Sequence, residues 1–221
     1  MYKKVLIAED FDSINIAVKQ TLESLGVEEI QYAKYCDDAL IKFIKANNDN
    51  KPFDLLISDL SFVSDYREVE IPSGEKLIEV IKNIQPELNV IVYSVEDKAY
   101  IIKTLFEEQK INAFVHKGRN SISQLKTAIE TLLYGRTFIS PELAHALQVK
   151  LGKEIDSYDI TLLNHLANGV AIDDMESLFK KINITPNSKS SIEKRVAKLK
   201  DYFKANNNIH LIAITKDLGI I

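Results

Sequence analysis

Three acidic residues stand at the ends of two apolar runs in the first third of the chain. Glu9 and Asp10 follow the run KKVLIA, and Asp59 follows FDLLIS. A hydroxyl and an ammonium group have similar positions, since Ser94 ends LNVIVYS and Lys117 follows INAFVH. Oxygen ligands without soft donors suit Mg²⁺, and a metal and a lysine together would keep Asp59 ionised. These residue types predict a carboxylate that attacks a phosphoryl group and becomes an aspartyl phosphate.

The apolar runs alternate with segments of helical period, which predicts how the polar residues are positioned. Near-continuous apolar runs are typical of strands covered on both faces, and repeated βα units predict a doubly wound, five-stranded parallel sheet. The carboxyl ends of parallel strands meet at one edge, so the five polar residues are expected to converge there. The predicted strands are KKVLIAE, EEIQYA, FDLLIS, LNVIVYS and INAFVH, and the predicted helices are Asp12–Leu25, Asp37–Ala46, Gly74–Ile84, Asp97–Glu108 and Ser121–Tyr134.

Composition narrows the class of protein. The 221 residues, 46% hydrophobic and 27% charged, allow one large folded domain or two small ones. Cys36 is the only cysteine, so no intramolecular disulfide or multi-cysteine metal site can form, and a reducing cytosol is expected. Nothing resembles a signal peptide or a membrane span of about 18 apolar residues. The location expected is the cytoplasm.

Common catalytic constellations are missing from the sequence. The four histidines, His116, His145, His165 and His210, have no metal-ligand spacing, which argues against zinc. There is also no nucleophile elbow and no phosphate-cradling glycine loop. We therefore expect no enzyme activity beyond possible self-phosphorylation and autodephosphorylation.

Turn residues after Tyr134, followed by purely helical patterns, predict a second domain. Residues 136–154 contain Pro141 and Gly152 and are expected to form a linker of a helix and turns. Residues 155–221 contain helical patterns without a strand pattern, which predicts a small all-α domain. Its four predicted helices are Tyr158–Ala167, Asp173–Ile182, Ser190–Phe203 and Asn208–Leu218.

The third of these helices is basic. Residues 189–204 carry six basic side chains against two acidic ones. With the preceding helix and the turn NITPNS, it predicts a helix-turn-helix. Hydroxyls and long cations opposite the apolar stripe suit the DNA major groove; an acidic membrane surface is the weaker alternative, because the apolar face fits a domain core. The candidate DNA contacts are Ser190, Ser191, Lys194 and Lys198, with Arg195 on the flank of the helix.

Residues 1–135 resemble a response-regulator receiver domain of bacterial two-component systems. The resemblance rests on LIAED, LLISDL, VIVYS and AFVHKG. It implies a flavodoxin-like fold, Mg²⁺ held by Glu9, Asp10 and Asp59, and phosphorylation of Asp59 by a sensor histidine kinase. It also implies that Ser94 hydrogen-bonds the phosphoryl group, that Phe114 moves with it, and that Lys117 contacts it.

One loop departs from the receiver pattern. The family's proline and glycine after the phosphorylated aspartate appear here as Pro72 and Gly74, several residues late. The intervening polar residues 60–73 lack a clear period, and loops of this length tend to be functional or mobile. We expect this loop to be mobile and to help select the kinase.

Residues 155–221 resemble a LuxR/NarL-type DNA-binding domain. LLNHLANGVAIDDM is similar to its first helix and glycine turn, and NNIHLIAITKDLGII to its last helix. The combined resemblance implies a two-component response regulator in which phosphorylation of Asp59 controls DNA binding and transcription, with a homodimer expected at least when phosphorylated. Two alternatives stay open: a C-terminal domain that binds a protein instead of DNA, and a receiver that switches without phosphate.

Overall fold

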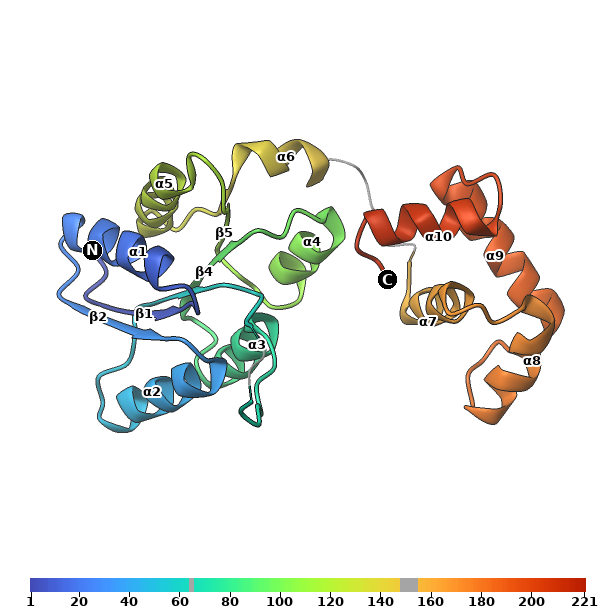
Figure 1. Cartoon of the computed structure of the whole chain (residues 1–221), viewed down its shortest axis with the longest axis horizontal. Helices are drawn as coiled ribbons and strands as arrows, with labels where there is room; N and C mark the ends of the chain where they lie inside the picture. The colour runs from blue at the N-terminus through green and yellow to red at the C-terminus, as the bar shows by residue number, and fades with distance from the viewer. Residues whose placement is uncertain (64–65, 148–154) are drawn as a thin grey trace. The chain divides into compact units, whose positions relative to one another are not determined.

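The structure is a computed structural model of the chain and describes residues 1–63, 66–147 and 155–221. These residues form two compact units, one ending at Ala146 and one ending at Ile221 (Figure 1). Ser64 and Asp65 of the predicted loop and residues 148–154 of the predicted linker lie outside the described residues.

The first unit is built on a parallel sheet. In the described residues the sheet has six strands in the order β2-β1-β3-β4-β5-β6, every neighbouring pair parallel. The doubly wound parallel fold is therefore confirmed. The strands are β1 (Lys4–Ala8), β2 (Glu29–Ala33), β3 (Leu55–Ser58), β4 (Asn89–Ser94), β5 (Ala113–His116) and β6 (Phe138–Ile139).

The predicted number of five strands is wrong by one. Phe138 and Ile139 pair with Ala113 and Phe114, so β6 extends the sheet beyond β5 within the segment predicted to be a linker. A two-residue strand is too short to show a period in the sequence, and this one forms because β5 offers a free edge for pairing. The helix α6 (Pro141–Leu147) follows directly.

Helices cover both faces of the sheet. The helices α1 and α5 lie on one side, and α2 and α3 on the other (Figure 1). The core on the first side joins the strands to Val18, Leu22, Leu125 and Ile129, all fully buried. The predicted helix bounds agree with the structure to within two residues at each end. The bounds are α1 (Asp12–Ser24), α2 (Cys36–Asn48), α3 (Gly74–Ile84), α4 (Ala99–Glu107) and α5 (Ser121–Leu133).

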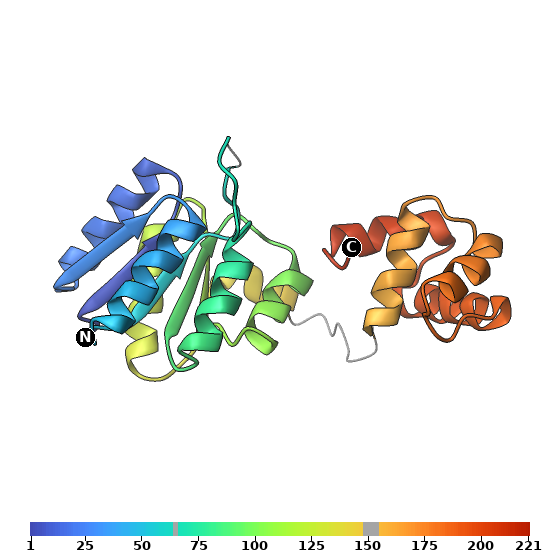
Figure 2. The ribbon, with the colours of Figure 1, turned by 90° about the horizontal axis from the view of Figure 1, so that it is seen from below.

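The long loop between β3 and α3 is anchored at its base and along its second half. The Gly74 N–H donates to the carbonyl of Leu60 at 2.9 Å, which closes the loop. The Ile71 N–H donates to the Asp37 carboxylate at 2.9 Å, and the Arg67 guanidinium lies 4.0 Å from the centre of the Tyr35 ring. The loop projects from the body of the sheet (Figure 2), although these described contacts tie part of it to the start of α2.

The second unit contains four helices among the described residues from Ile155 to Ile221. Its core consists mainly of Leu162, Leu163, Met175, Phe179, Ile192, Val196, Leu199 and Leu211. Asp156, Ser188 and Asn207 cap three of the helices with side-chain hydrogen bonds. The four helices predicted here are confirmed, and α8 and α9 form the helix-turn-helix pair. The bounds are α7 (Ser157–Ala167), α8 (Ile172–Lys181), α9 (Lys189–Phe203) and α10 (Asn208–Asp217).

Among the described residues, no helix combines the length and the apolar character needed to cross a membrane.

Candidate functional site

The acidic residues lie at the point where the strand order reverses. Strand β1 lies between β2 and β3, so the chain connections leave in opposite directions on either side of the boundary between β1 and β3. Glu9 and Asp10 follow β1 and Asp59 follows β3, while the Asp59 N–H donates to the Ala8 carbonyl at 2.9 Å. In open parallel sheets this switch point is where ligands bind, outside the carboxyl ends of the strands. The topology therefore places all three acids at the same edge of the sheet, beside this switch point.

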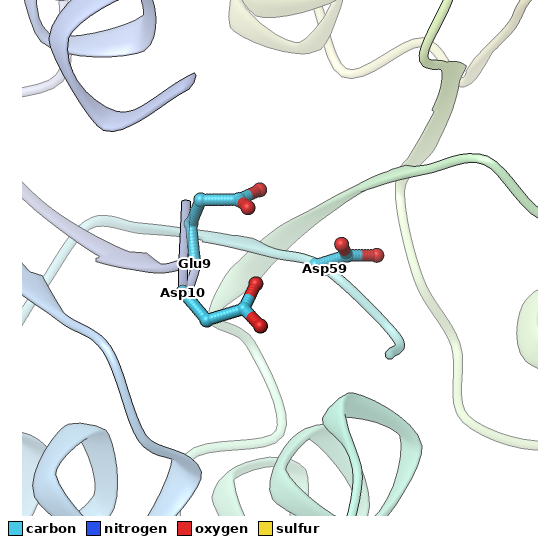
Figure 3. A group of neighbouring side chains, drawn as sticks. All are labelled: Glu9, Asp10 and Asp59. Carbon is cyan, nitrogen blue, oxygen red and sulfur yellow. The ribbon is translucent and has the colours of Figure 1, made fainter. Parts of the chain in front are cut away.

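The three carboxylates form a compact oxygen cluster. One oxygen from each of Glu9, Asp10 and Asp59 lies within 4.8 Å of the others, and the three side chains are neighbours at the ends of their strands (Figure 3). Glu9 is 2% exposed and Asp59 5% exposed. The Oδ1 atom of Asp10 is buried and has no hydrogen-bond partner among the described residues. An unpaired carboxylate oxygen beside two buried carboxylates is the donor set that a hard cation such as Mg²⁺ takes, so the residues fit this metal.

Lys117 supplies positive charge to the same cluster. Its Nζ lies 2.6 Å from Oε2 of Glu9 and 2.6 Å from Oδ2 of Asp59. Burial lowers the pKa of Lys117, but hydrogen bonds to Asp59 and Glu9 outweigh it and raise the pKa overall, so the ammonium stays charged. Burial also raises the pKa of Glu9, and the hydrogen bond from Lys117 offsets part of this rise. The ammonium therefore neutralises part of the charge that three close carboxylates would otherwise concentrate.

Backbone groups fix the orientation of Asp59. The Leu60 N–H donates to Oδ1 at 2.6 Å, which leaves Oδ2 directed at Lys117. The hydroxyl of Ser58 donates to the Asp59 carbonyl at 2.7 Å. On the other side of this carbonyl, the Cα of Gly74 packs so closely that a Cβ there would lie 1.8 Å from the oxygen. The start of α3 thus rests directly on the residue that carries the carboxylate.

Ser94 and Lys117 are held together at the ends of β4 and β5. The Lys117 N–H donates to the Ser94 carbonyl at 2.7 Å, and both Ser94 and Phe114 are fully buried. The structure thus brings Glu9, Asp10, Asp59, Ser94 and Lys117 to one edge of the sheet. Phe114 lies three residues before Lys117, inside β5.

Three contributors to the site were not expected from the residue pattern. The side-chain amide of Asn15 donates to the Glu9 carbonyl at 2.8 Å, and the Val63 N–H donates to Oδ2 of Asp10 at 2.9 Å. Gly74 is the third. A late glycine after the long loop was the only signal for any of them, because backbone donors and a helical asparagine leave no distinctive mark in a sequence.

The basic helix α9 presents part of the expected DNA face. Ser190, Lys194 and Lys198 are exposed. Ser191 is half-buried; its hydroxyl accepts a hydrogen bond from the Ser188 hydroxyl at 2.8 Å within the cap of the helix. Three of the five candidate residues are therefore exposed to solvent.

Arg195 is placed differently from the expectation. Its guanidinium donates to both carboxylate oxygens of Asp159, one bond at 2.6 Å, and to Asp156 at 2.9 Å. Asp159 is fully buried and forms a capping box with Asp156 at the start of α7. Arg195 therefore joins α9 to the start of α7 through these two carboxylates. A helical projection places a side chain on a flank but does not show which acids of another helix meet it.

No protein-family model and no curated protein matches the sequence. A structure of the RcsB response regulator from Salmonella typhimurium matches with a TM-score of 0.67 and 22% identity, covering 97% of this chain and 99% of that one. This chain has the fold of RcsB. An RcsB–DNA complex matches with a TM-score of 0.67 and 22% identity over 99% of this chain and 100% of that chain.

The match extends to RcsB in a phosphomimetic state. The isolated REC domain of RcsB from Salmonella enterica serovar Typhimurium, solved with the phosphomimetic BeF3⁻, covers 66% of this chain and 99% of its own. Its identity is 24% and its TM-score 0.54. The likeness to RcsB thus shows the fold of both units.

Proposed function

We propose that the protein is a two-component response regulator whose phosphorylation at Asp59 controls DNA binding. One observation carries the proposal: three carboxylates and a lysine ammonium converge at the switch point of a receiver-type sheet. The RcsB fold, in structures described as bound to DNA or to a phosphomimetic, supports it. The sensor histidine kinase is the proposed phosphodonor, and the cytoplasm the proposed location.

The proposed reaction follows from the charges at the site. An oxygen of the Asp59 carboxylate attacks phosphorus, a new P–O bond forms, and the bond from phosphorus to the donor's histidine nitrogen breaks. Glu9, Asp10 and Asp59 would hold Mg²⁺, which when bound offsets the charge on the phosphoryl oxygens. Lys117 contributes a second positive charge beside Asp59. No further enzymatic reaction is proposed beyond self-phosphorylation and loss of this phosphoryl group.

The proposed switch acts through Ser94 and Phe114. The new phosphoryl oxygens would draw the Ser94 hydroxyl into a hydrogen bond and bias a pre-existing equilibrium in which Phe114 moves with it. The result is a homodimer formed through the α4–β5–α5 face or the α1/α5 face. Two copies of α9 would then lie about one DNA turn apart, which predicts an inverted-repeat site.

The proposed DNA contacts are Ser190, Ser191, Lys194 and Lys198 at the start and outer face of α9. The alternative is a C-terminal domain that binds a protein. Solvent-exposed lysines on the second helix of a helix-turn-helix pair favour DNA, because their long side chains reach phosphates when the helix enters the major groove.

Phosphorylation is tested by intact mass. Incubation with Mg²⁺ and acetyl phosphate should add one phosphoryl group to the wild type and to the surface control Asp49→Asn, but none to Asp59→Asn. An adduct that survives Asp59→Asn would contradict phosphorylation at this residue. No adduct at all would also contradict it and would favour a receiver that switches without phosphate.

DNA binding is tested by genome-wide occupancy of the wild type beside Asp59→Asn, followed by salt titration on a recovered site. Each lost phosphate contact should reduce the slope of log K against log salt by about one, so Lys194→Ala with Lys198→Ala should reduce it by about two. Lys181→Ala, an exposed lysine on α8, is the control. Binding that is unchanged in the double variant would oppose this docking, and no occupancy would favour the protein-binding alternative.

A further inference from the structure

Ser140 is a fully buried polar residue between the sixth strand and the helix that follows it. Its N–H donates to the carbonyl of Phe114 at 3.0 Å, which continues the pairing of β6 with β5. Its carbonyl accepts from the Leu143 N–H at 2.9 Å and so starts α6. The backbone of Ser140 therefore joins the edge of the sheet to the segment that leads toward the second unit.

The hydroxyl of Ser140 is part of a chain of hydrogen bonds. It accepts from the His116 N–H at 2.8 Å and donates to the side-chain carbonyl of Gln124. The side-chain amide of Gln124 donates in turn to the Glu142 carboxylate at 3.0 Å. Glu142 lies in the first turn of α6. The chain thus links β5, α5 and α6 through one buried hydroxyl, and bonds connected in this way strengthen one another.

The first member of this chain adjoins the phosphoacceptor site. His116 immediately precedes Lys117, and its Nε2 donates to the carbonyl of Val95 at 3.2 Å, while Val95 immediately follows Ser94. Its Nδ1 lies 3.8 Å from Oε1 of Glu142. The ends of β4 and β5 are therefore bonded twice, by Lys117 to Ser94 and by His116 to Val95, and the second link also reaches α6.

We propose that Ser140 and His116 couple the phosphoacceptor site to the start of α6. The proposal rests on the proposed function and specifies how the site regulates the remainder of the chain. A phosphoryl group on Asp59 competes for Lys117, the neighbour of His116, and attracts Ser94, the neighbour of Val95. It therefore shifts both ends of the hydrogen bond between His116 and Val95. Because the His116 N–H is bound to a buried hydroxyl, this shift changes the hydrogen bonds that hold α6 to the sheet.

Ser140 is a positioning residue in this scheme, since it lies apart from the reacting atoms. Its structural role alone would alter stability but not the response to a phosphoryl group. The discriminating measurement is therefore the change that a phosphoryl mimic causes at a distance, compared between variants.

Amide hydrogen exchange of the full chain, with and without Mg²⁺ and beryllofluoride, supplies this measurement. In the wild type, beryllofluoride should protect the peptide that contains Asp59. It should also change exchange in residues 138–144 by roughly fivefold, the lower end of coupling between sites. In Ser140→Ala the protection at Asp59 should remain, while the change in residues 138–144 should fall by at least half.

Two further variants complete the design. Thr127→Ala removes a hydroxyl from α5 that bonds only to the carbonyl of its own helix at Ser123 in the described contacts, and it should respond as the wild type does. Gln124→Ala cuts the same chain at its half-buried third member and should weaken the response without emptying the buried site.

The outcomes separate the two proposals. No protection at Asp59 in the wild type would contradict the proposed function. Protection at Asp59 with no change in residues 138–144, or with the full change retained in both Ser140→Ala and Gln124→Ala, would overturn the coupling alone. Loss of protection at Asp59 itself in Ser140→Ala would also overturn it, because Ser140 would then shape the site and not transmit its state.

Discussion

Gly74 packs directly against the carbonyl of Asp59, and a Cβ at position 74 would lie 1.8 Å from that oxygen. The chain therefore leaves Asp59, forms the long loop and returns to the same point. The Gly74 N–H, bonded to the Leu60 carbonyl, closes this return. The extra residues of the loop are accommodated without opening the site, because its two ends are fixed by one hydrogen bond and one glycine.

Gly74→Ala should displace Asp59 or the start of α3, because the three nearest atoms, in Asp59 and Leu60, all belong to the backbone and cannot rotate away. We expect a loss of about 1–3 kcal/mol of unfolding free energy from overpacking, and slower phosphorylation by acetyl phosphate. Urea denaturation and intact mass measure the two effects. Gly118→Ala is the control, since its Cβ would meet only His116 Nδ1, at 3.8 Å. If both variants have the same unfolding free energy and the same phosphorylation rate, the backbone near Gly74 can move aside to accommodate a Cβ, and the prediction is wrong.

Lys117→Ala should make the stability of the protein depend more strongly on Mg²⁺. Removing the ammonium leaves Glu9 and Asp59 without their shared partner, which costs about 3 kcal/mol for a buried pair. A bound divalent cation would replace part of this charge, so the rise in Tm with Mg²⁺ should exceed that of the wild type. Lys76→Ala, which breaks an exposed pair with Glu79, should show the wild-type dependence. If the Tm of Lys117→Ala does not change when Mg²⁺ is added, a metal at these carboxylates is contradicted.

Asp10→Asn tests whether the unpaired carboxylate oxygen of Asp10 is a metal ligand. The substitution keeps the shape of the side chain but removes its charge, so Mg²⁺ affinity should fall roughly tenfold or more. Isothermal titration of the wild type and the variant measures this change. Asp12→Asn, an exposed acid two residues away that pairs with Lys34, is the matched control. Unchanged affinity in Asp10→Asn would remove Asp10 from the ligand set.

Arg195→Ala and Lys194→Ala should affect different properties although the residues are adjacent: the first the stability of the second unit, the second DNA binding. Arg195→Ala leaves buried Asp159 without its partner, and we expect about 3–5 kcal/mol of destabilisation of the second unit. Lys194→Ala should leave stability within about 0.5 kcal/mol and reduce only the salt dependence of DNA binding. Urea denaturation separates them. A stable Arg195→Ala variant with a reduced salt slope would return Arg195 to the DNA face.

Cys36 should contribute to a loss of stability at alkaline pH. Burial, with the nearby Asp37, Asp10 and Asp59 carboxylates, raises the pKa of this thiol from 9.0 to about 12. As pH rises, the thiol ionises in the unfolded chain before it does in the folded protein. Its contribution to the free energy of unfolding is therefore complete below pH 9 and is lost between pH 9 and pH 12, with about 1.4 kcal/mol lost at pH 10. The difference in unfolding free energy between the wild type and Cys36→Ala should shrink by this amount between pH 7 and pH 10. A constant difference would mean that the native thiol ionises normally.

Periodicity in the sequence predicted most of the fold. Strands buried on both faces are continuous apolar runs and each helix carries an apolar stripe, so five strands and nine helices could be placed from local pattern alone. β6 could not, because two residues carry no period and their pairing depends on the free edge of β5.

Some residues of the candidate site were likewise predictable from the sequence. Glu9, Asp10, Asp59, Ser94 and Lys117 were predictable because each lies at the end of a strand, and parallel strands bring those ends together. The sequence by itself also determined that α9 is amphipathic and basic.

The tertiary structure alone decided which groups those side chains meet. It placed Gly74 on the Asp59 carbonyl, assigned Arg195 to Asp159 and not to the outer face, and buried Ser140 between His116 and Gln124. Pattern follows from the local geometry of strands and helices, whereas these contacts join residues distant in the chain. Their partners are set by how the elements pack, which no local period encodes.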